Sequence, residues 1–443
     1  MRRIALENLK KWKNRKVHKP LIIHGARQVG KTWLMQEFGN TQYKNTAYVL
    51  FDKNKRMEDL FSGDMDVKRL LMGLEAETKQ KILPKETLII FDEIQECPNA
   101  LSALKYFNEN VSEYDIVAAG SLLGVFLHEN VSFPVGKVEF MNLYPMTFYE
   151  FLSALGEENL CTLLDSNDYK LITTFKDKFL LYLRMYFYIG GMPEVVGSFS
   201  ADSDFIAVRT IQKQILKSYA NDFSKHIPAN QIQKVGQIWN SIPAQLAKEN
   251  KKFIYKEVQK GASAKTFEIA LEWLIQSGLV YRIARVSKPA IPLKGYENAS
   301  GAFKLFLVDV GLMSAMAGVD VRALLEGDVL FTEFKGSLTE QYVCQELEAQ
   351  GDFYISYWAN EAPAQAEIDF ILQFGKQIIP VEVKSSTNLR AKSLSVYREK
   401  FKPKIEIRTS QADYNVAGRL YDIPLYAIGL LKDVLGENVE FRM

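Results

Sequence analysis

The sequence predicts an α/β fold, and three observations carry this prediction. Short apolar runs that suit buried strands alternate with segments of helical periodicity over residues 1–150. The same alternation returns over residues 331–443. The clearest run, Leu88–Phe91, is unbroken by polar residues, which is typical of a parallel sheet that helices cover on both faces.

The expected elements follow from these patterns in chain order. Residues 1–18 should form an amphipathic helix, because Ala5, Leu9 and Trp12 fall on one side at helical spacing. Strands are expected at residues 21–23, 47–51, 88–91 and 115–119, with a helix over 33–38 after the first of them. Later in the chain we expect a helix over 338–348 and strands at 354–358, 368–373 and 378–383.

The middle of the chain is expected to be mainly helical. Residues 145–228 are rich in Leu, Phe and Tyr at helical spacing, and a helix capped by Ser263 should precede a strand over 279–284. A helix followed by a strand is similar to a winged helix-turn-helix. Such modules read DNA in some proteins and are plain packing units in others, so both interpretations stay open.

The composition fits a folded chain without membrane spans. Hydrophobic residues make up 47% and charged residues 24% of the 443 residues, and a net charge of +2 gives no global field that would favour nucleic acid or membranes. No run of ~18 apolar residues occurs. Cys97, Cys161 and Cys344 lack metal-ligand spacing, so we expect neither a disulfide framework nor a zinc site, as is usual in the cytoplasm.

Positive charge is crowded into the first 20 residues. The cations there are Arg2, Arg3, Lys10, Lys11, Lys13, Arg15, Lys16 and Lys19. The simpler interpretation is a solvated face on the opening helix. The alternative is a short basic arm that attracts phosphates.

One loop has the residues that cradle a triphosphate. The eight residues Gly25, Ala26, Arg27, Gln28, Val29, Gly30, Lys31 and Thr32 fit the pattern G-x-x-x-x-G-K-[ST] after a predicted strand and before a predicted helix. The glycines let backbone N–H groups turn toward phosphate, and the helix adds its positive N-terminal end. Lys31 would contact the β and γ phosphates, and Thr32 would offer its hydroxyl to Mg²⁺. The sequence therefore predicts ATP and Mg²⁺ as ligands.

Further polar residues follow two later strands of the same stretch. Asp92 ends the strand at 88–91 and would hold Mg²⁺, directly or through water, while Glu93 would polarise the attacking water. Ser121 follows the strand at 115–119, where it would either sense the γ-phosphate or simply form a turn. If subunits assemble into a homo-oligomer, a charge partner in trans is expected, and Lys137 and Arg184 are the candidates.

A second group of chemistry-bearing residues lies near the C-terminus. Asp369 is on one expected strand and Glu382 and Lys384 are on the next, where residues two apart project to the same face. A hairpin through residues 374–376 would bring Asp369 beside them, and Glu340 could reach them from the preceding helix. A divalent metal at Asp369 and Glu382 would relieve carboxylate repulsion and activate water, with Lys384 orienting that water. The alternative is an exposed Glu382–Lys384 ion pair.

With both groups of residues in view, the chain resembles a bacterial and archaeal family. Its members join an AAA-like ATPase domain to a C-terminal domain of the DUF4143 type. Besides the loop at 25–32, the resemblance rests on LIIFDEIQ, AAGSLLG, Tyr144–Leu152, Gly190–Glu194, Lys304–Leu312, Glu340, Glu367–Phe370 and Pro380–Lys384. These stretches cover nearly the whole chain in the expected order.

The resemblance implies four parts and two sites. The parts are a P-loop ATPase core at 1–150, a helical lid-like region at 151–228, a winged-helix-like module at 229–330 and an α/β PD-(D/E)XK nuclease-like, restriction-endonuclease-like domain at 331–443. The catalytic candidates are then Lys31, Asp92, Glu93 and Ser121 in the first part and Glu340, Asp369, Glu382 and Lys384 in the last. The family often has arginine where this chain has Lys137, and lysine cannot form the same bidentate contact with phosphate.

Two functions stay open from sequence. The first is an ATP-hydrolysing protein, cytoplasmic and without a membrane partner, that is coupled to a nuclease-like domain and acts on or near DNA. The second is a nucleotide-dependent regulatory switch that binds a protein or DNA partner, with a catalytically inert nuclease-like fold.

Overall fold

The computed structural model describes residues 2–120, 134, 136–248, 251–297, 301–326, 332–360, 366–387 and 392–438. These residues form two compact units. The first unit is Met1–Tyr144 with Gln276–Leu279, and the second is Pro145–Ile275 with Val280–Met443. No helix in the described ranges is long and apolar enough to cross a membrane.

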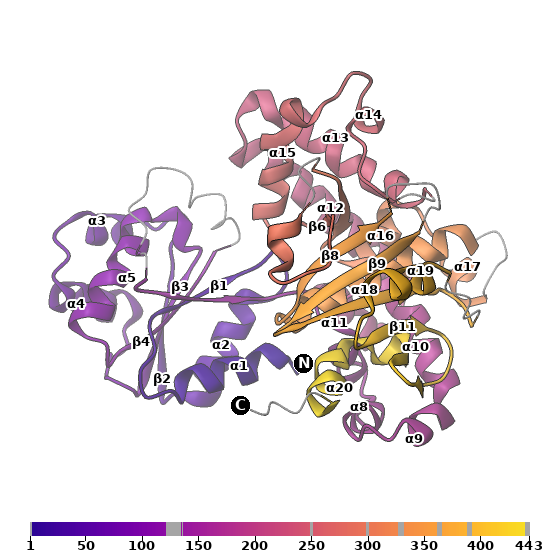
Figure 1. Ribbon diagram of the computed structural model, residues 1–443. Helices are drawn as coiled ribbons and strands as arrows, with labels where there is room; N and C mark the ends of the chain where they lie inside the picture. The colour runs from indigo at the N-terminus through magenta and orange to yellow at the C-terminus, as the bar shows by residue number, and fades with distance from the viewer. Residues whose placement is uncertain are drawn as a thin grey trace. The chain divides into compact units, whose positions relative to one another are not determined.

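The first unit is built on a five-stranded parallel sheet (Figure 1). Its strands are β1 (Leu21–His24), β2 (Asn45–Leu50), β3 (Thr87–Asp92), β4 (Asp115–Ala119) and β5 (Glu139–Asn142), in the order β2-β3-β4-β1-β5. Its helices are α1 (Ile4–Lys13), α2 (Lys31–Gln42), α3 (Lys55–Ser62), α4 (Val67–Thr78), the 3-10 turn η1 (Ile94–Glu96) and α5 (Pro98–Asn110). The predicted α/β class is confirmed, and four of the five strands coincide closely with the strands expected from sequence.

Apolar side chains from alternate strand positions build the core of this unit. Val49, Phe91 and Ile116 pack with apolar side chains of α3, α4 and α5 on one face of the sheet. All six residues of β3 are buried, which agrees with the unbroken apolar run that predicted this strand. The edge strand β5 was not predicted, because its burial alternates and Phe140 is exposed.

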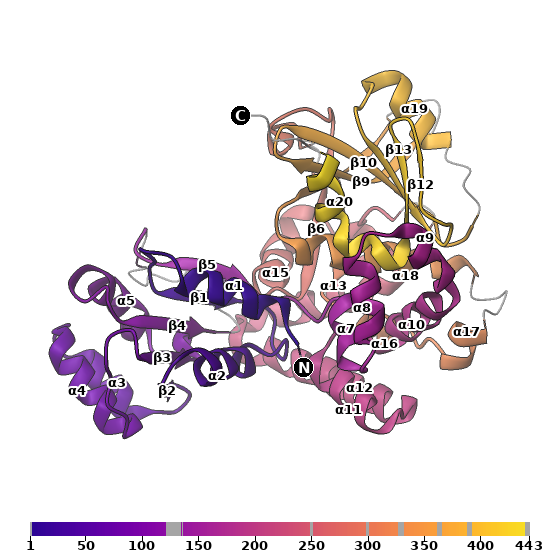
Figure 2. The same ribbon diagram turned by 90° about the horizontal axis from the view of Figure 1, so that it is seen from below.

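The second unit is built on an eight-stranded mixed sheet (Figure 2). Its strands are β6 (Val280–Val286), β7 (Phe303–Leu307), β8 (Tyr354–Ala359), β9 (Glu367–Phe374), β10 (Gln377–Val383), β11 (Glu406–Ser410), β12 (Asn415–Ala417) and β13 (Leu420–Pro424). Their order is β12-β13-β11-β10-β9-β8-β6-β7. The sheet therefore includes two strands that precede residue 331, so it extends across the boundary that local sequence texture suggested.

The helices of the second unit come mainly before residue 280. They are α7 (Phe148–Ala154), α8 (Glu158–Asp165), α9 (Tyr169–Thr174), α10 (Lys176–Ile189), α11 (Pro193–Asp202), α12 (Phe205–His226), α13 (Ala229–Leu246), α14 (Tyr255–Val258) and α15 (Ala264–Gln276). Later elements are η2 (Leu293–Tyr296), α16 (Val310–Met316), α17 (Val321–Glu326), α18 (Thr332–Gln350), α19 (Lys392–Phe401), η4 (Leu425–Leu430) and α20 (Leu431–Asn438). The expected helical middle is thus observed.

Two of the stretches quoted for the family resemblance meet inside the second unit. The buried carboxylate of Asp309 caps α16 by accepting from the Leu312 N–H at 2.9 Å, and it also accepts from the Gly191 N–H at 2.6 Å. A Cβ at Gly190 would lie 2.2 Å from this carboxylate. These residues therefore have a packing role in this fold, because the close approach of α10 to α16 requires glycine.

Candidate nucleotide and carboxylate–lysine sites

The glycine loop joins β1 to α2 at the end of the parallel sheet where its strands finish. Gly30 lies just before α2 with a φ of 94°, in the left-handed region that favours glycine. A Cβ at Gly25 would lie 2.2 Å from the Leu143 carbonyl oxygen, so only glycine fits this approach. The loop thus has the backbone geometry and the position, ahead of a helix N-terminus, that a phosphate-binding loop needs.

Lys31 is turned into the loop. Its ammonium group is buried and donates hydrogen bonds to the carbonyl oxygens of Gly25 at 2.8 Å and Ala26 at 2.7 Å. Burial lowers the pKa of Lys31 to about 8, against a smaller opposing effect of Glu93 and Asp92. A buried cation with two neutral acceptors is poorly compensated, and a phosphate would supply the missing negative charge.

The hydroxyl of Thr32 and the carboxylate of Asp92 come together at this edge. Thr32 Oγ1 donates to Asp92 Oδ2 at 2.7 Å. Thr32 is on α2, which follows β1, and Asp92 ends β3; β4 lies between β1 and β3 in the sheet. Asp92 also accepts from the Tyr48 hydroxyl at 2.9 Å and from the Glu93 N–H at 3.0 Å. Hydroxyl and carboxylate oxygens are the ligands Mg²⁺ prefers, so this donor set fits that ion.

The remaining candidates of the first unit have varied placements. Glu93 has a left-handed backbone with a φ of 50°, and its carboxylate accepts from Gln95 Nε2 at 2.5 Å. Lys137 pairs with Glu109 at 2.8 Å. Ser121 lies outside the described residues. Tyr48 was missed in the sequence because only the pairing of β2 with β3 brings it to Asp92.

In the second unit, Asp369 and Glu382 are neighbours on adjacent strands. The antiparallel register of β9 and β10 pairs Phe370 with Val381, which brings the two carboxylates side by side, and the Val383 N–H donates to Asp369 Oδ2 at 2.8 Å. Lys384 Nζ contacts Glu382 Oε1 at 2.7 Å. The predicted hairpin through residues 374–376 is confirmed by this register.

Glu340 reaches the same place from α18. It lines, with Asp369, Glu382 and Lys384, a cleft of about 370 Å³ whose other residues are Lys251, Gly336, Val383, Ser385 and Ser386. The structure therefore brings together all four residues that the sequence singled out here. An isolated, exposed Glu382–Lys384 pair is not what the fold produces, because Glu382 is buried.

Two lysines that were not predicted also enter this cluster. Lys251, from the segment between α13 and α14, forms an ion pair with Glu340. Lys304 on β7 is 1% exposed and lies 3.5 Å from Glu340, 2.5 Å from Glu367 and 3.9 Å from Asp369. Both come from regions far from the strand pattern in sequence, so only the sheet order and the path of the chain could reveal them.

These lysines change the electrostatics of the carboxylates. Burial opposes the charge of Glu340, but Lys251 and Lys304 outweigh it and lower the pKa of Glu340 to about 2. Burial, then Glu340 and Glu382, raise the pKa of Asp369 well above its usual range. Burial also raises the pKa of Glu382, and one of its oxygens, Oε2, is buried without a hydrogen-bond partner in the described residues.

The fit of a divalent metal to this cluster is therefore incomplete. The donor chemistry suits Mg²⁺ or Mn²⁺, since three carboxylates face one cleft. Among the described residues, however, no group of three or more His, Cys, Asp or Glu side chains is arranged to hold a metal ion. Lys251 and Lys304 supply positive charge to Glu340, where a metal would otherwise do so.

The winged-helix-like region has the order of elements expected for such a module. α15 precedes the antiparallel pair β6 and β7. Phe267, Ala270 and Leu274 are buried, whereas the exposed side chains include Lys265 in the first turn and Glu268 and Glu272 further along. Because cationic and acidic side chains are mixed on this surface, it favours neither DNA reading nor plain packing.

Comparisons with known proteins match three parts of the chain to family models. Residues 17–152 match the family model of an AAA domain, residues 335–428 match a domain of unknown function (DUF4143), and residues 180–323 match another (DUF8612). No curated protein sequence matches the chain significantly.

Several solved structures share features of the fold at low similarity. The Walker-type ATPase paby2304 of Pyrococcus abyssi is 13% identical, with a TM-score of 0.44 over 71% of this chain and 95% of that one. The Aeropyrum pernix ORC1 protein, solved in complex with DNA, is 14% identical, with a TM-score of 0.27 over 72% and 93%. AMPPCP-bound DnaA from Aquifex aeolicus is 15% identical, with a TM-score of 0.26 over 62% and 87%. The family models, rather than these distant neighbours, identify the domains.

Proposed function

Because the chain joins an AAA domain to a DUF4143 domain, we propose that it binds and hydrolyses ATP and couples this cycle to a nuclease-like unit that acts on DNA. The observation that carries the nucleotide part is the hydrogen bond between Thr32 and Asp92. It gathers, beside a phosphate-type loop, the two oxygen ligands that Mg²⁺–ATP requires.

The residues of the first unit have separate tasks in this proposal. The backbone N–H groups of Gly25–Thr32 bind the phosphates, and Lys31 leaves its loop carbonyls to neutralise the β and γ phosphates. Mg²⁺ would be held by Thr32 and Asp92 and would offset phosphate charge. Glu93 accepts a proton from the water that attacks the γ-phosphorus, once its carboxylate turns away from Gln95.

In the second unit, the cleft at Glu340, Asp369, Glu382 and Lys384 is the proposed place of action on DNA. Lys384 would contact a phosphate or orient water, and Glu382, whose pKa is raised, would take up a proton. The described side chains do not form a ready metal site there, so these roles belong to the side chains alone. Lys137 is paired with Glu109, so it does not offer a free positive charge to the γ-phosphate. If subunits assemble, a neighbouring subunit would supply that charge in trans.

The second candidate is a nucleotide-dependent switch whose nuclease-like unit is inert. The observation that favours it is the contact of Lys251 and Lys304 with Glu340, which satisfies the carboxylate cluster internally. In that case the cleft is an ion-pair network within the fold, and the nucleotide cycle controls binding to a protein or DNA partner.

ATP turnover tests the first part. Lys31→Ala should abolish hydrolysis, because the cation that faces the phosphates is lost. Lys68→Ala is the matched control, since Lys68 is an exposed lysine on α4. Wild-type turnover in Lys31→Ala would overturn the assignment of the loop.

DNA cleavage separates the two candidates. Wild type and Glu382→Ala are incubated with plasmid and linear DNA, with Mg²⁺ or Mn²⁺, with and without ATP. Cleavage that Glu382→Ala loses supports the nuclease. Equal behaviour of both proteins under every condition, with ATP hydrolysis intact, supports the switch.

A further inference from the structure

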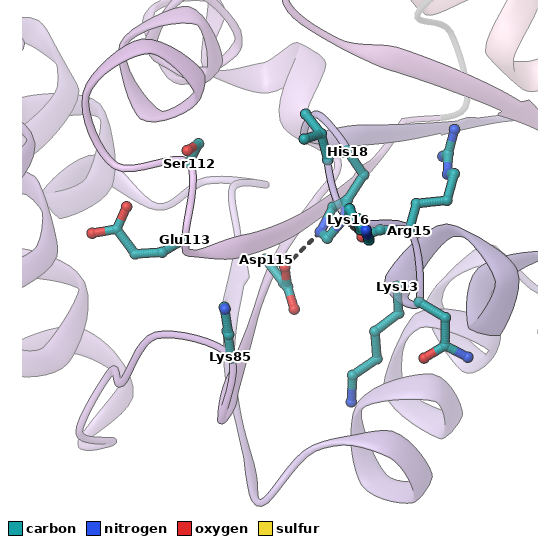
Figure 3. A pocket seen from close by; sticks show the side chains of 10 residues that line it. Lys13, Arg15, Lys16, His18, Lys85, Ser112, Glu113 and Asp115 are labelled. Carbon is teal, nitrogen blue, oxygen red and sulfur yellow. Dashed lines mark hydrogen bonds and ion pairs between the residues drawn. The ribbon is translucent and has the colours of Figure 1, made fainter.

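A second pocket lies at the amino ends of the parallel strands, whereas the glycine loop lies at their carboxyl ends. It has a volume of about 410 Å³ and is lined by Lys13, Asn14, Arg15, Lys16, Val17, His18, Lys85, Ser112, Glu113 and Asp115 (Figure 3). We call it the basal pocket. His18 precedes β1, Lys85 precedes β3 and Asp115 begins β4, whereas Asp92 is the last residue of β3 and the glycine loop follows β1. Six residues of strand span roughly 20 Å, so a nucleotide at the loop does not reach this pocket.

Most of the negative charge in the basal pocket is already satisfied. Asp115 is buried and is bonded by His18 Nε2 at 2.7 Å and by the Tyr43 hydroxyl at 2.9 Å. The hydrogen bond to Asp115 raises the pKa of His18, which favours its positive form. Glu113 is exposed, and in Figure 3 its carboxylate extends away from the His18–Asp115 pair.

The positive charge is only partly satisfied. Lys13 bonds the Gln42 carbonyl oxygen and lies 3.7 Å from the Tyr43 ring centre, and Arg15 pairs with Glu139 at 2.5 Å. By contrast, the exposed ammonium groups of Lys16 and Lys85 have no ion-pair partner in the described part of the chain. The backbone N–H groups of Lys16 and Val17 likewise have no acceptor among the described residues.

We propose that the basal pocket binds phosphate groups, and specifically the phosphodiester backbone of a nucleic-acid strand, independently of sequence. Free lysine ammonium groups and unpaired backbone N–H groups are the donors that phosphate oxygens use. The one arginine of the pocket is engaged by Glu139, so a bidentate clamp on a single small phosphate is disfavoured. Lysines act as point charges, which suits sequence-independent contact with successive phosphates.

The choice of a nucleic acid rests on the proposed action on DNA, but the pocket is separate from the cleft of the second unit. A DNA contact in the first unit would bring the polymer to the domain that hydrolyses ATP. It would also explain the crowding of cations in the first 20 residues, which a solvated helix face does not require. Arg3, for comparison, is used internally, since it donates to the Val29 and Tyr144 carbonyl oxygens.

The test measures DNA affinity as a function of salt. Full-length Glu382→Ala is the parent, so that no DNA is cut, and it is titrated into a short labelled duplex without nucleotide. Lys16→Glu/Lys85→Glu is compared with Lys55→Glu/Lys68→Glu, which changes net charge equally on exposed positions of α3 and α4. Loss of two phosphate contacts should flatten the slope of log K against log salt by ~1.8 in the first variant alone.

In one outcome, the parent binds the duplex while the two double variants show equal slopes and equal affinities. That result would overturn phosphate binding at the basal pocket and leave the proposed function standing. A parent that binds no DNA would overturn both the proposed action on DNA and the nucleic-acid assignment. Inorganic pyrophosphate is the second arm, in a Lys31→Ala background that disables the nucleotide loop. Pyrophosphate binding that depends on Lys16 and Lys85, without DNA binding, would assign the pocket to free phosphates and contradict the proposal.

Discussion

Burial changes the pKa of Lys31, the cation of the glycine loop. The ammonium of Lys31 lies among carbonyl oxygens, and burial lowers its pKa to about 8, below the ordinary lysine value. The pKa of the folded protein is therefore below that of the unfolded chain. The resulting cost to stability is full below about pH 8 and is relieved as the pH rises from there toward the ordinary lysine pKa.

This depressed pKa predicts a pH dependence of ATP binding. Phosphates raise the pKa of Lys31, so binding above about pH 8 takes up a proton. The Kd for ATP should then rise with pH by up to about tenfold per unit, which corresponds to ~1.4 kcal/mol. Fluorescence titration with a labelled ATP analogue at pH 7 and pH 9 measures this effect. Lys31→Met should bind weakly at both values, and a Kd of wild type that does not change over this range would contradict the prediction.

At the residue scale, the sequence predicted site residues that belong to a recognisable motif. It missed site residues that reach their place only through strand pairing or packing. Thr32 and Asp92 were predicted to act together, and the fold brings them within hydrogen-bond distance. Tyr48 and Lys251 belong to no motif, and Lys304 begins one of the family stretches without being singled out. Each reaches its site only through pairing or packing between segments far apart in sequence. A single sequence contains no signal for such contacts.

At the scale of elements, Asp309 joins the helices α10 and α16. Its two carboxylate oxygens accept from two buried N–H groups, those of Gly191 and Leu312. Burial raises the pKa of Asp309 to about 6, above the unfolded value, so stability falls as the pH rises through the interval between these values and the carboxylate is charged at pH 7.5.

Asp309→Asn is therefore expected to destabilise the protein although it removes a buried charge. An amide has one acceptor oxygen, so its NH₂ group must face the Gly191 or the Leu312 N–H. An unpaired buried donor costs ~1–3 kcal/mol. Urea unfolding at pH 7.5 measures the change. Asp320→Asn is the control, because Asp320 accepts a hydrogen bond from the exposed Arg322 N–H and asparagine caps helices equally well. Equal midpoints for the two variants would refute the role of Asp309.

The segment between α13 and α14 supplies the cation that neutralises Glu340, so Lys251→Met should improve metal binding. Removing this ammonium frees a carboxylate oxygen and makes the cleft more negative. We expect Mn²⁺ affinity to increase at least about tenfold, or ~1.4 kcal/mol. This gain is small compared with the Coulomb energy between a metal ion and a unit charge within contact distance. Electron paramagnetic resonance on the full-length protein measures free Mn²⁺.

Two further variants identify the site of that effect. Lys248→Met removes an exposed lysine of the same segment that pairs with Glu257, and it should leave Mn²⁺ affinity unchanged. Adding Glu382→Ala to Lys251→Met should abolish the gain. An unchanged affinity in Lys251→Met would mean that this lysine does not compete with a metal.

At this same scale, strands were easier to predict than their partners. The hairpin of β9 and β10 followed from two apolar runs around Gly375, which has a left-handed φ of 55°. The pairing of β6 with β8 has no local signal, because the two strands are separated by several helices and run parallel. The sequence therefore indicated β6, β8, β9 and β10, but it indicated neither β7, β11, β12 and β13 nor the extent of the sheet.

At the scale of the whole molecule, the order of strands decides which part of the chain can fold alone. The match to DUF4143 begins at residue 335, after β6 and β7. Yet β6 pairs with β8 through Ala284↔Ser356 and Val286↔Trp358, and Lys304 of β7 compensates three carboxylates. Gln341 of α18 also bonds both the N–H and the carbonyl oxygen of Leu307.

A fragment of residues 331–443 is therefore expected to misfold, whereas residues 145–443 should fold. The shorter fragment leaves β8 as an open edge whose Ile355, Tyr357 and Trp358 are buried in the intact sheet, and such edges aggregate. It also leaves Glu340 and Asp369 without Lys304. Circular dichroism, size-exclusion chromatography and urea unfolding of both fragments measure the difference. Cooperative unfolding of a monomeric 331–443 fragment would show that β6 and β7 are an accessory to the sheet, not a part that its folding needs.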